Sequence, residues 1–330
     1  MNKPPSCFLT LPIVATLMLA GCGPQGGNQG APAAAEAPVA EPPADAAVQP
    51  APSWQDAANA AYPGVFDEAV VLKDGQWGGA PYVEGAASAP RAGLAGDLLL
   101  QGDVDGDAAE EAVVLLWSSG GGSGTFDYVA VLERDAKGEV STVAIAPLGD
   151  RVKVRSAAIE DGRIVFDVVQ AGPGDAACCP GQKVRRTFAV EGKSMTETST
   201  EDRGRMTLSD LAGEWRLATF GAEETPPPEV QITVRFENGT VAGRAACNRY
   251  TGSVEEGEMP GQVSLSGPLA LTRMMCPPPL MDWEQRYTAA LEGLAQYSFV
   301  AGHLILSWRN GNESGSLHFV RATEGEQTGE

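Results

Sequence analysis

The amino-acid sequence predicts a mainly β protein with two folded units, preceded by a leader and a tether. Short apolar runs of strand length recur along most of the chain, with turn residues between them. Asp-Gly and Asn-Gly pairs separate several of these runs, and such pairs are strong hairpin signals. Helical periodicity is clear in a single segment near the C-terminus. The expected ranges are 1–21 for the leader, 22–52 for a disordered tether, 53–200 for an N-terminal antiparallel β-rich unit, 207–322 for a second unit, and 323–330 for a disordered tail.

The leader is a short apolar run, Phe8–Ala20, that continues directly into Gly21 and Cys22. A membrane-spanning helix needs about 20 apolar residues, so we expect this run to be a removed signal segment. The stretch Leu19–Cys22 resembles the lipobox of bacterial lipoproteins. This resemblance implies cleavage before Cys22 and attachment of lipid, including palmitate, at the new N-terminus. An ordinary secretory signal cut near residue 20 is the alternative. Gly23 in place of Asp implies sorting to the periplasmic face of the outer membrane.

Composition excludes some classes of partner. The formal net charge is −20, and nucleic-acid binding depends on Lys and Arg that neutralise phosphates. Residues 192–194 end like a nucleotide-binding P-loop, but Thr187 stands where the motif requires its first glycine. We therefore expect neither nucleic acid nor a nucleotide as a partner. Residues 23–52 contain no aromatic residue and are rich in Ala and Pro, so they cannot bury enough apolar surface to fold.

The N-terminal unit is expected to begin with a short helix at 54–62 and to continue as antiparallel strands. Asp161 and Gly162 separate two strand-like runs and predict a tight hairpin. The polar stretch 194–205 has no apolar pattern and is expected to connect the two units. The expected strands cover 69–72, 112–117, 128–132, 152–159 and 163–169.

The second unit is expected to contain strands on both sides of one helix. Asn238 and Gly239 predict a hairpin turn. The segment 281–295 has apolar residues at helical spacing. Alternating residues near the C-terminus predict closing strands around 304–308 and 317–319. The earlier strands are expected at 214–220, 230–236 and 240–244. The apolar face of the helix comprises Trp283, Tyr287, Ala290, Leu291 and Leu294.

Several short motifs follow one another through the second unit in a definite order. They are 211–215 (LAGEW), 241–243 (VAG), 247–252 (CNRYTG), 271–276 (LTRMMC), the helical residues Glu284, Tyr287 and Leu291, and 304–306 (LIL). In order and spacing, the segment from Leu208 to Val320 resembles the META domain of HslJ-like bacterial lipoproteins. The resemblance implies a small antiparallel β-barrel-like sheet crossed by one helix. Ala246 stands where this family usually has glycine, and this departure puts the family's tight φ > 0 geometry at that position in doubt but not the fold.

The N-terminal unit carries an acidic loop before its most apolar strand. The oxygen donors at loop positions 1, 3, 5, 7 and 9 would be the side chains of Asp103, Asp105 and Asp107, the carbonyl of Ala109 and the side chain of Glu111. Calcium prefers such a series of oxygen ligands, and the loop resembles the calcium loops of integrin-type repeats. A structural calcium is one interpretation, and an acidic turn before a buried strand is the other. Ala108 occupies the position where glycine is preferred. The whole unit resembles a β-rich domain of bacterial envelope lipoproteins.

Four cysteines follow Cys22, and export from the cytoplasm would permit disulfides. A bond between Cys247 and Cys276 would join two segments of the second unit and stabilise it by about 3–4 kcal/mol. Cys178 and Cys179 are adjacent, so a vicinal disulfide, two free thiols and a bond to another chain all stay open. Zinc is not expected, because the cysteines divide between the two units.

No catalytic motif emerges from the sequence, and we expect the protein not to be an enzyme. His303 and His318 stand on strand positions that face away from the apolar stripe, so both are expected to be solvated. The expected function is that of a non-enzymatic envelope lipoprotein with a binding or stress-related role. Its expected partners are the membrane, through lipid on Cys22, and an envelope protein. The alternative is an inhibitor or partner of an envelope hydrolase such as a lysozyme-like enzyme.

Overall fold

A computed structural model describes residues 49–85, 88–221 and 223–322. The expected leader 1–21, the tether up to residue 48 and the tail 323–330 lie outside these residues. All of the described residues belong to one compact unit by their internal contacts. The predicted fold class is confirmed, because antiparallel strands dominate the described chain and helices are few and short.

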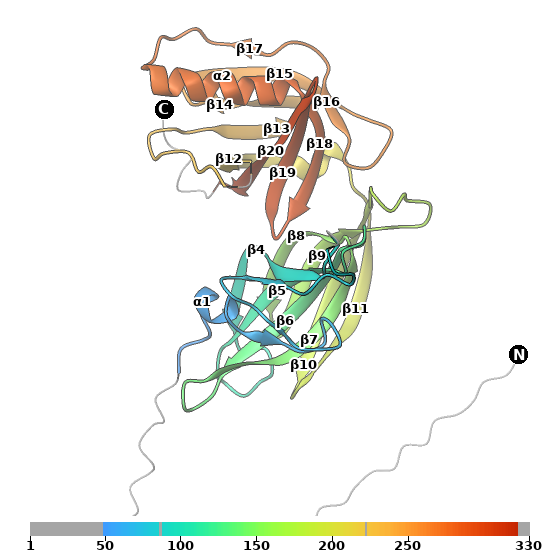
Figure 1. Ribbon diagram of the computed structural model, residues 1–330. Coiled ribbons are helices and arrows are strands. Elements are labelled where there is room, and N and C mark those ends of the chain that lie inside the picture. The colour runs from blue at the N-terminus through green and yellow to red at the C-terminus, as the bar shows by residue number, and fades with distance from the viewer. Residues whose placement is uncertain (1–48, 86–87, 222, 323–330) are drawn as a thin grey trace, which may run out of the picture. The chain divides into compact units, whose positions relative to one another are not determined.

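Residues 49–205 form a two-layer antiparallel β structure, called the sandwich below (Figure 1). One sheet runs in the order β3-β4-β5-β6-β7, and the other in the order β11-β10-β9-β8. The first sheet consists of β3 (Gln76–Gly78), β4 (Arg91–Gly102), β5 (Glu111–Ser119), β6 (Phe126–Arg134) and β7 (Val140–Asp150). The second consists of β8 (Lys153–Glu160), β9 (Arg163–Gln170), β10 (Gln182–Glu191) and β11 (Ser194–Arg205).

Strand β5 is buried on both faces, which explains its unbroken apolar sequence. Val113 and Leu115 face the second sheet and pack in a core with Phe166 of β9. Val114 and Leu116 point to the opposite face. The N-terminal segment covers that face with α1 (Trp54–Ala57), β1 (Ala61–Tyr62) and β2 (Val70–Val71). A strand buried on both faces shows no alternation of apolar and polar residues.

The expected helix at 54–62 is wrong in length. Helix α1 begins with a capping box at Ser53 and ends after one turn. Tyr62 instead pairs with Val70 as a strand residue, and its buried hydroxyl donates to the Ala57 carbonyl at 2.7 Å. The packed structure also begins earlier than residue 53, because Gln101 donates to the carbonyl of Pro52. Tertiary contacts therefore decide the local structure of this segment.

The expected connector 194–205 is instead the strand β11, which pairs along its length with β10. It is an edge strand and most of its side chains are exposed. Because neither face of it is deeply buried, its sequence lacks the apolar alternation that identifies other strands. The serine and threonine residues of β11 fit an exposed edge strand. Because polar residues are also typical of linkers, the sequence alone did not distinguish the two.

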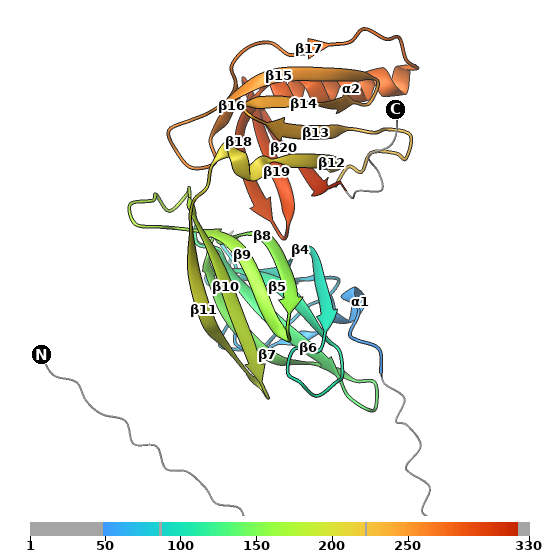
Figure 2. The same ribbon diagram turned by 180° about the vertical axis from the view of Figure 1, so that it is seen from behind.

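The described residues of 207–322 form a further antiparallel sheet, called the closed sheet below (Figure 2). Its order is β16-β15-β14-β13-β12-β20-β19-β18, with β17 paired to β15. The two ends of this order meet, because residues 262 and 296 form a bridge and the Tyr297 N–H donates to the Gly261 carbonyl at 2.7 Å. The strands are β12 (Gly213–Phe220), β13 (Thr233–Glu237), β14 (Thr240–Ala245), β15 (Asn248–Glu256), β16 (Val263–Leu265), β17 (Ala270–Leu271), β18 (Leu294–Val300), β19 (His303–Asn310) and β20 (Glu313–Arg321).

Helix α2 (Pro278–Glu292) lies along β14 and β15 and buries Tyr287 and Leu291 in the core of the closed sheet (Figure 1). It begins three residues earlier than the helix predicted at 281–295, because prolines fit the first turn of a helix. It ends at Gly293, and Leu294 belongs to β18. The one-helix, barrel-like architecture expected for this unit is confirmed within the described residues.

Two predicted hairpin turns are present. Asp161 and Gly162 have φ values of 49° and 70°, and Asn238 and Gly239 have values of 49° and 74°. Positive φ at both central residues matches the turn that suits the twist of a two-residue hairpin. The flanking residues pair directly in both cases, which fixes the register of β8 with β9 and of β13 with β14.

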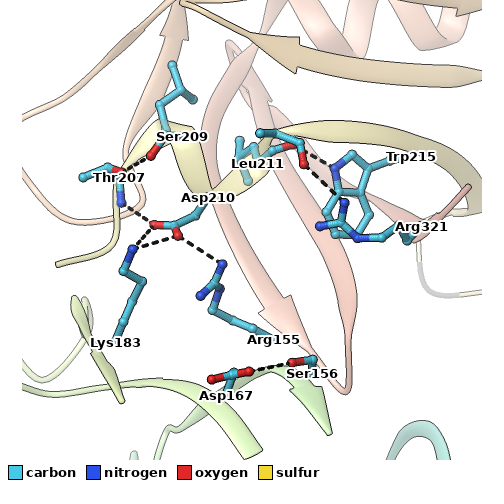
Figure 3. Close-up of polar contacts among 12 residues, drawn as sticks. Arg155, Ser156, Asp167, Lys183, Thr207, Ser209, Asp210, Leu211, Trp215 and Arg321 are labelled. Atoms are coloured by element: carbon cyan, nitrogen blue, oxygen red, sulfur yellow. Dashed lines mark hydrogen bonds and ion pairs between the residues drawn. The ribbon is translucent and has the colours of Figure 1, made fainter. Parts of the chain in front are cut away.

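Asp210 connects the sandwich to the closed sheet (Figure 3). It lies in a short 3-10 turn, Leu208–Leu211, and accepts a hydrogen bond from the Thr207 N–H at 2.8 Å. Its carboxylate also accepts from Lys183 at 2.8 Å and from Arg155 at 3.0 Å. A nearly buried carboxylate with two cationic partners is a well-compensated charge.

The turn between β18 and β19 packs against the sandwich. Ala301 is 7% exposed and belongs to the core between the two sandwich sheets. The Gly302 N–H donates to the Val154 carbonyl at 3.0 Å. A Cβ atom at Gly96 would lie 2.6 Å from the Cβ of Ala301, so only glycine fits opposite this turn. The contact closes one end of the sandwich.

Candidate functional site

The acidic loop between β4 and β5 is folded around the carboxylate of Asp103. The two oxygens of Asp103 accept hydrogen bonds from the Gly106 N–H at 2.7 Å and from the Ala108 N–H at 3.1 Å. The Asp107 N–H donates to Asp105 at 3.2 Å. These bonds fold the loop back on itself around the side chains of Asp103 and Asp105.

Three acidic side chains meet at this loop. One carboxylate oxygen each of Asp103, Asp105 and Glu111 lies within 4.8 Å of the others. Glu111 is only 1% exposed, and its Oε2 accepts a hydrogen bond from the Val104 N–H at 3.0 Å. Burial raises the pKa of Glu111 to about 7, and the neighbouring aspartates act in the same direction. The arrangement concentrates negative charge around a largely buried carboxylate.

The donor set fits a hard divalent cation, since every side-chain donor is an oxygen. A cation there would offset the repulsion among the carboxylates. Two other predicted ligands are placed differently. Asp107 is outside the close group, and its Oδ1 accepts from the Ala109 N–H at 2.8 Å. Ala109 itself is half-buried in the loop.

Ala108 and Ala246, which both stand where glycine was expected, adopt the left-handed backbone conformation that glycine prefers. Ala108, in the acidic loop, has φ of 72°, and Ala246, before Cys247, has φ of 62°. Such values strain a residue that carries a Cβ atom. The tight geometry that the sequence put in doubt at Ala246 is therefore present with alanine, as it is at Ala108, and the N–H groups of both residues are hydrogen-bonded.

All four cysteines of the described chain are paired in the structure. Cys247 is bonded to Cys276, with their Cα atoms 6.0 Å apart, and Cys178 is bonded to the adjacent Cys179. The first bond ties the start of β15 to the segment before α2. The second, of the arrangements left open by the sequence, is a vicinal disulfide in the loop between β9 and β10.

A buried polar network lies beside the Cys247–Cys276 bond, and sequence reasoning did not identify it as a network. Asn248 is 2% exposed and Glu284 is 7% exposed. Asn248 donates to Glu284 through its backbone and its side chain, and accepts from Thr272 and Met274. The sequence does contain a signal of this network. Glu284 stands three residues before Tyr287, so it lies on the apolar face of the helix, where a charged residue is expected to have a buried polar partner.

The two histidines are not simply solvated, which corrects the sequence prediction. The Nε2 atom of His303 lies 2.8 Å from Oδ1 of Asp97 in the sandwich. His318 shares a hydrogen bond with Ser316 at 2.9 Å, and burial lowers its pKa. Both side chains take part in the packing of their strands.

The predicted lipidation residue Cys22 and the whole stretch Leu19–Cys22 lie outside the described residues. Among the residues that the structure does describe, no helix has the length and apolar character needed to cross a membrane.

The comparisons with known proteins identify a family for the segment that forms the closed sheet. The family model described as the META domain matches residues 207–324. No curated protein matches the chain. One similar solved structure is the "NMR structure of the protein from Burkholderia xenovorans", which is 25% identical and covers 35% of this chain and 86% of its own. Its TM-score of 0.28 carries no structural argument. The family match confirms the predicted META domain, at residues 207–324 of this chain.

Proposed function

We propose that this protein is a non-enzymatic binding module of the bacterial cell envelope, in which the META domain and the sandwich act together. Lipid on Cys22 would hold it at the periplasmic face of the outer membrane. The observation that supports this proposal most directly is the pairing of all four described cysteines. Disulfides persist in oxidising compartments such as the periplasm and are rare in the cytosol.

A binding role also fits the contacts of several charged side chains in the described chain, which are paired with other protein groups. Glu284 is engaged by Asn248, and His303 lies against Asp97. Asp210 of the META domain accepts hydrogen bonds from Arg155 and Lys183 of the sandwich. These groups position the backbone, so the proposal assigns the protein recognition and not catalysis.

The acidic loop is proposed to hold a structural calcium ion. Asp103, Asp105 and Glu111 would supply carboxylate oxygens, because these three converge. The ion would neutralise charge next to the buried start of β5 and fix the loop. It has no proposed part in a reaction.

Membrane anchoring is tested by labelling the full chain with radioactive palmitate in a bacterial host. The parent chain should incorporate label and fractionate with the outer membrane. Cys22→Ser should abolish labelling, because the lipid acceptor is lost. The matched control is Cys7→Ser, which changes a leader cysteine and should be labelled normally. Labelling that survives in the Cys22→Ser chain would overturn the anchor.

One observation favours a protein partner, such as an envelope hydrolase of the lysozyme class. Met275 is 98% exposed beside Cys276, in a segment held by the disulfide and by Asn248. A fixed, exposed methionine suits contact with another protein. Affinity capture from envelope extracts with the parent chain and with Met275→Glu decides this alternative. Stoichiometric recovery of one hydrolase by the parent only would support it.

A further inference from the structure

The loop between β9 and β10 carries two adjacent cysteines, Cys178 and Cys179, which are bonded to each other. In the chain-entropy model, a disulfide stabilises a fold because it closes a long loop in the unfolded chain. This bond closes a ring that contains a single peptide link, so it contributes little in that way. Neither the proposed membrane anchor nor the proposed calcium site uses it. Stability alone therefore does not explain the bond.

Other contacts hold the loop in place. The side chain of Asp175, which is 4% exposed, accepts hydrogen bonds from the N–H groups of Gly172 and Gly181 at 2.8 and 2.9 Å. It also accepts from Arg205 of β11 at 3.0 Å. These bonds join the two ends of the loop to each other and to the neighbouring strand. Because they involve neither sulfur atom, the path of the loop does not depend on the disulfide.

The backbone beside the two cysteines is held as well. The Cys179 N–H donates to the Ala176 carbonyl at 2.9 Å, and the Arg151 guanidinium donates to the Ala177 carbonyl at 3.0 Å. The peptide link keeps the Cα atoms of the two cysteines 3.8 Å apart, whether or not their sulfurs are bonded. Two thiols in this loop would therefore stay close together, which favours re-formation of the bond.

The two cysteines differ in exposure. Cys178 is exposed, whereas Cys179 is only 7% exposed. Both line a cavity of about 290 Å³, together with Met206 and Tyr297. The rate of thiol–disulfide exchange depends on access to the sulfur that is attacked. Access therefore favours attack on Cys178, with Cys179 as the leaving group.

The other disulfide of the described chain provides an internal comparison. Cys247 is 2% exposed, and its bond to Cys276 joins segments that are distant in the sequence. The Cα atoms of that pair lie 6.0 Å apart, within the usual range of about 4.4–6.8 Å. Those of the adjacent pair lie below this range. Exposed or strained disulfides are reduced more readily than buried structural ones, so the two bonds should differ in their ease of reduction.

We propose that Cys178 and Cys179 form a reversible redox site that accepts two electrons from a dithiol. A thiolate of the donor attacks Sγ of Cys178, a mixed disulfide forms, and Cys179 leaves as a thiolate that takes up the proton the donor has lost. The second thiol of the donor then attacks the donor sulfur of the mixed disulfide. Cys178 leaves and takes up the second proton. The donor ends as a disulfide, and both cysteines end as thiols.

This exchange is stoichiometric, and a disulfide acceptor reverses it by the same steps. It adds a chemical activity to the proposed binding function without depending on it. The anchor is measured by palmitate labelling at Cys22, and the redox site by the state of Cys178 and Cys179, so either proposal can fail while the other stands.

Graded reduction of the purified full chain tests the redox site. The native chain is equilibrated with increasing dithiothreitol and quenched with N-ethylmaleimide, and the cysteine peptides are quantified by mass spectrometry. Cys178 and Cys179 should be alkylated together at a dithiol concentration about tenfold or more below that needed for Cys247 and Cys276. Oxidised glutathione, added after removal of the dithiol, should restore the bond within the same chain. Equal reduction of the two disulfides, or free thiols at 178 and 179 in chain isolated without reductant, would overturn the proposal.

The variants Cys178→Ser and Cys179→Ser form a matched pair, because each leaves one thiol in the same loop. Ellman's reagent should react with the thiol of Cys179→Ser about tenfold faster or more than with that of Cys178→Ser, since only the former is exposed. Comparable rates would contradict attack at Cys178. If either variant does not fold, graded reduction of the parent chain still decides.

Discussion

Oε2 of Glu284 accepts a hydrogen bond from the backbone N–H of Asn248 at 2.6 Å, although the two residues are 36 positions apart. Oε1 of the same carboxylate accepts from the Asn248 side chain at 3.0 Å. The Asn248 Oδ1 in turn accepts from Thr272 and from the Met274 N–H. One helix residue thus organises the start of β15 and the loop that leads into α2.

The first prediction concerns this contact. Glu284→Gln should lower the free energy of unfolding by about 1–3 kcal/mol, because an amide offers one oxygen where two donors point and leaves a buried donor unsatisfied. Denaturant unfolding of the full chain measures the change. Glu292→Gln, at an exposed position of the same helix, should change little. Equal stability of the two variants would show that the buried contact contributes nothing.

The second prediction compares the two disulfides. Replacing Cys247 and Cys276 with alanine should destabilise the chain by about 3–4 kcal/mol, because this bond closes a long loop in the unfolded state. The pair Cys178→Ala and Cys179→Ala should cost far less, because adjacent cysteines close almost no loop. Thermal unfolding under non-reducing conditions measures both. A larger loss from the adjacent pair would contradict the loop argument.

The third prediction concerns calcium. Adding Ca²⁺ to the chelator-treated full chain should raise the unfolding temperature, since a ligand at 100 times its Kd stabilises by about 2.7 kcal/mol. Asp105→Asn should remove this shift, because its carboxylate belongs to the converging group. Asp107→Asn should retain more of it, because Asp107 lies outside that group. A parent protein that does not respond to calcium would end this proposal.

Sequence reasoning succeeded where local chemistry decides the structure. The pairs Asp161-Gly162 and Asn238-Gly239 need positive φ values, which few residue types accept readily, so both hairpins were predictable. The META domain was recognisable from the order of several motifs. Strand β5 was visible because it is buried on both faces.

Sequence reasoning failed where partners distant in the chain decide the outcome. Strand β11 is polar because it is an edge, so only its pairing with β10 identifies it. Asp127 looks like any other acid in a very acidic chain. Its hydrogen bond from the Val152 N–H depends on how β6 pairs with β5 and packs beside residue 152, which a single sequence does not specify. The partnership of Asn248 and Glu284 likewise needs the fold.

The last prediction is a pH dependence of stability that comes from Asp127. Burial raises its pKa from 3.8 to about 7 in the folded protein. The folded state therefore holds this proton more tightly than the unfolded state does. Its contribution to stability is fully present below about pH 3.8 and is lost as the pH rises through about 7.

Asp127→Asn cannot titrate at this position and keeps an oxygen for the Val152 N–H. The difference in unfolding free energy between the variant and the parent should therefore shift in favour of the variant between pH 4 and pH 8. Subtracting the two curves removes the similar contribution of Glu111, which is present in both proteins. Asp161→Asn should give a curve parallel to that of the parent. A difference between Asp127→Asn and the parent that stays constant with pH would show that the pKa of Asp127 is the same in the folded and the unfolded protein, which would contradict the effect of burial.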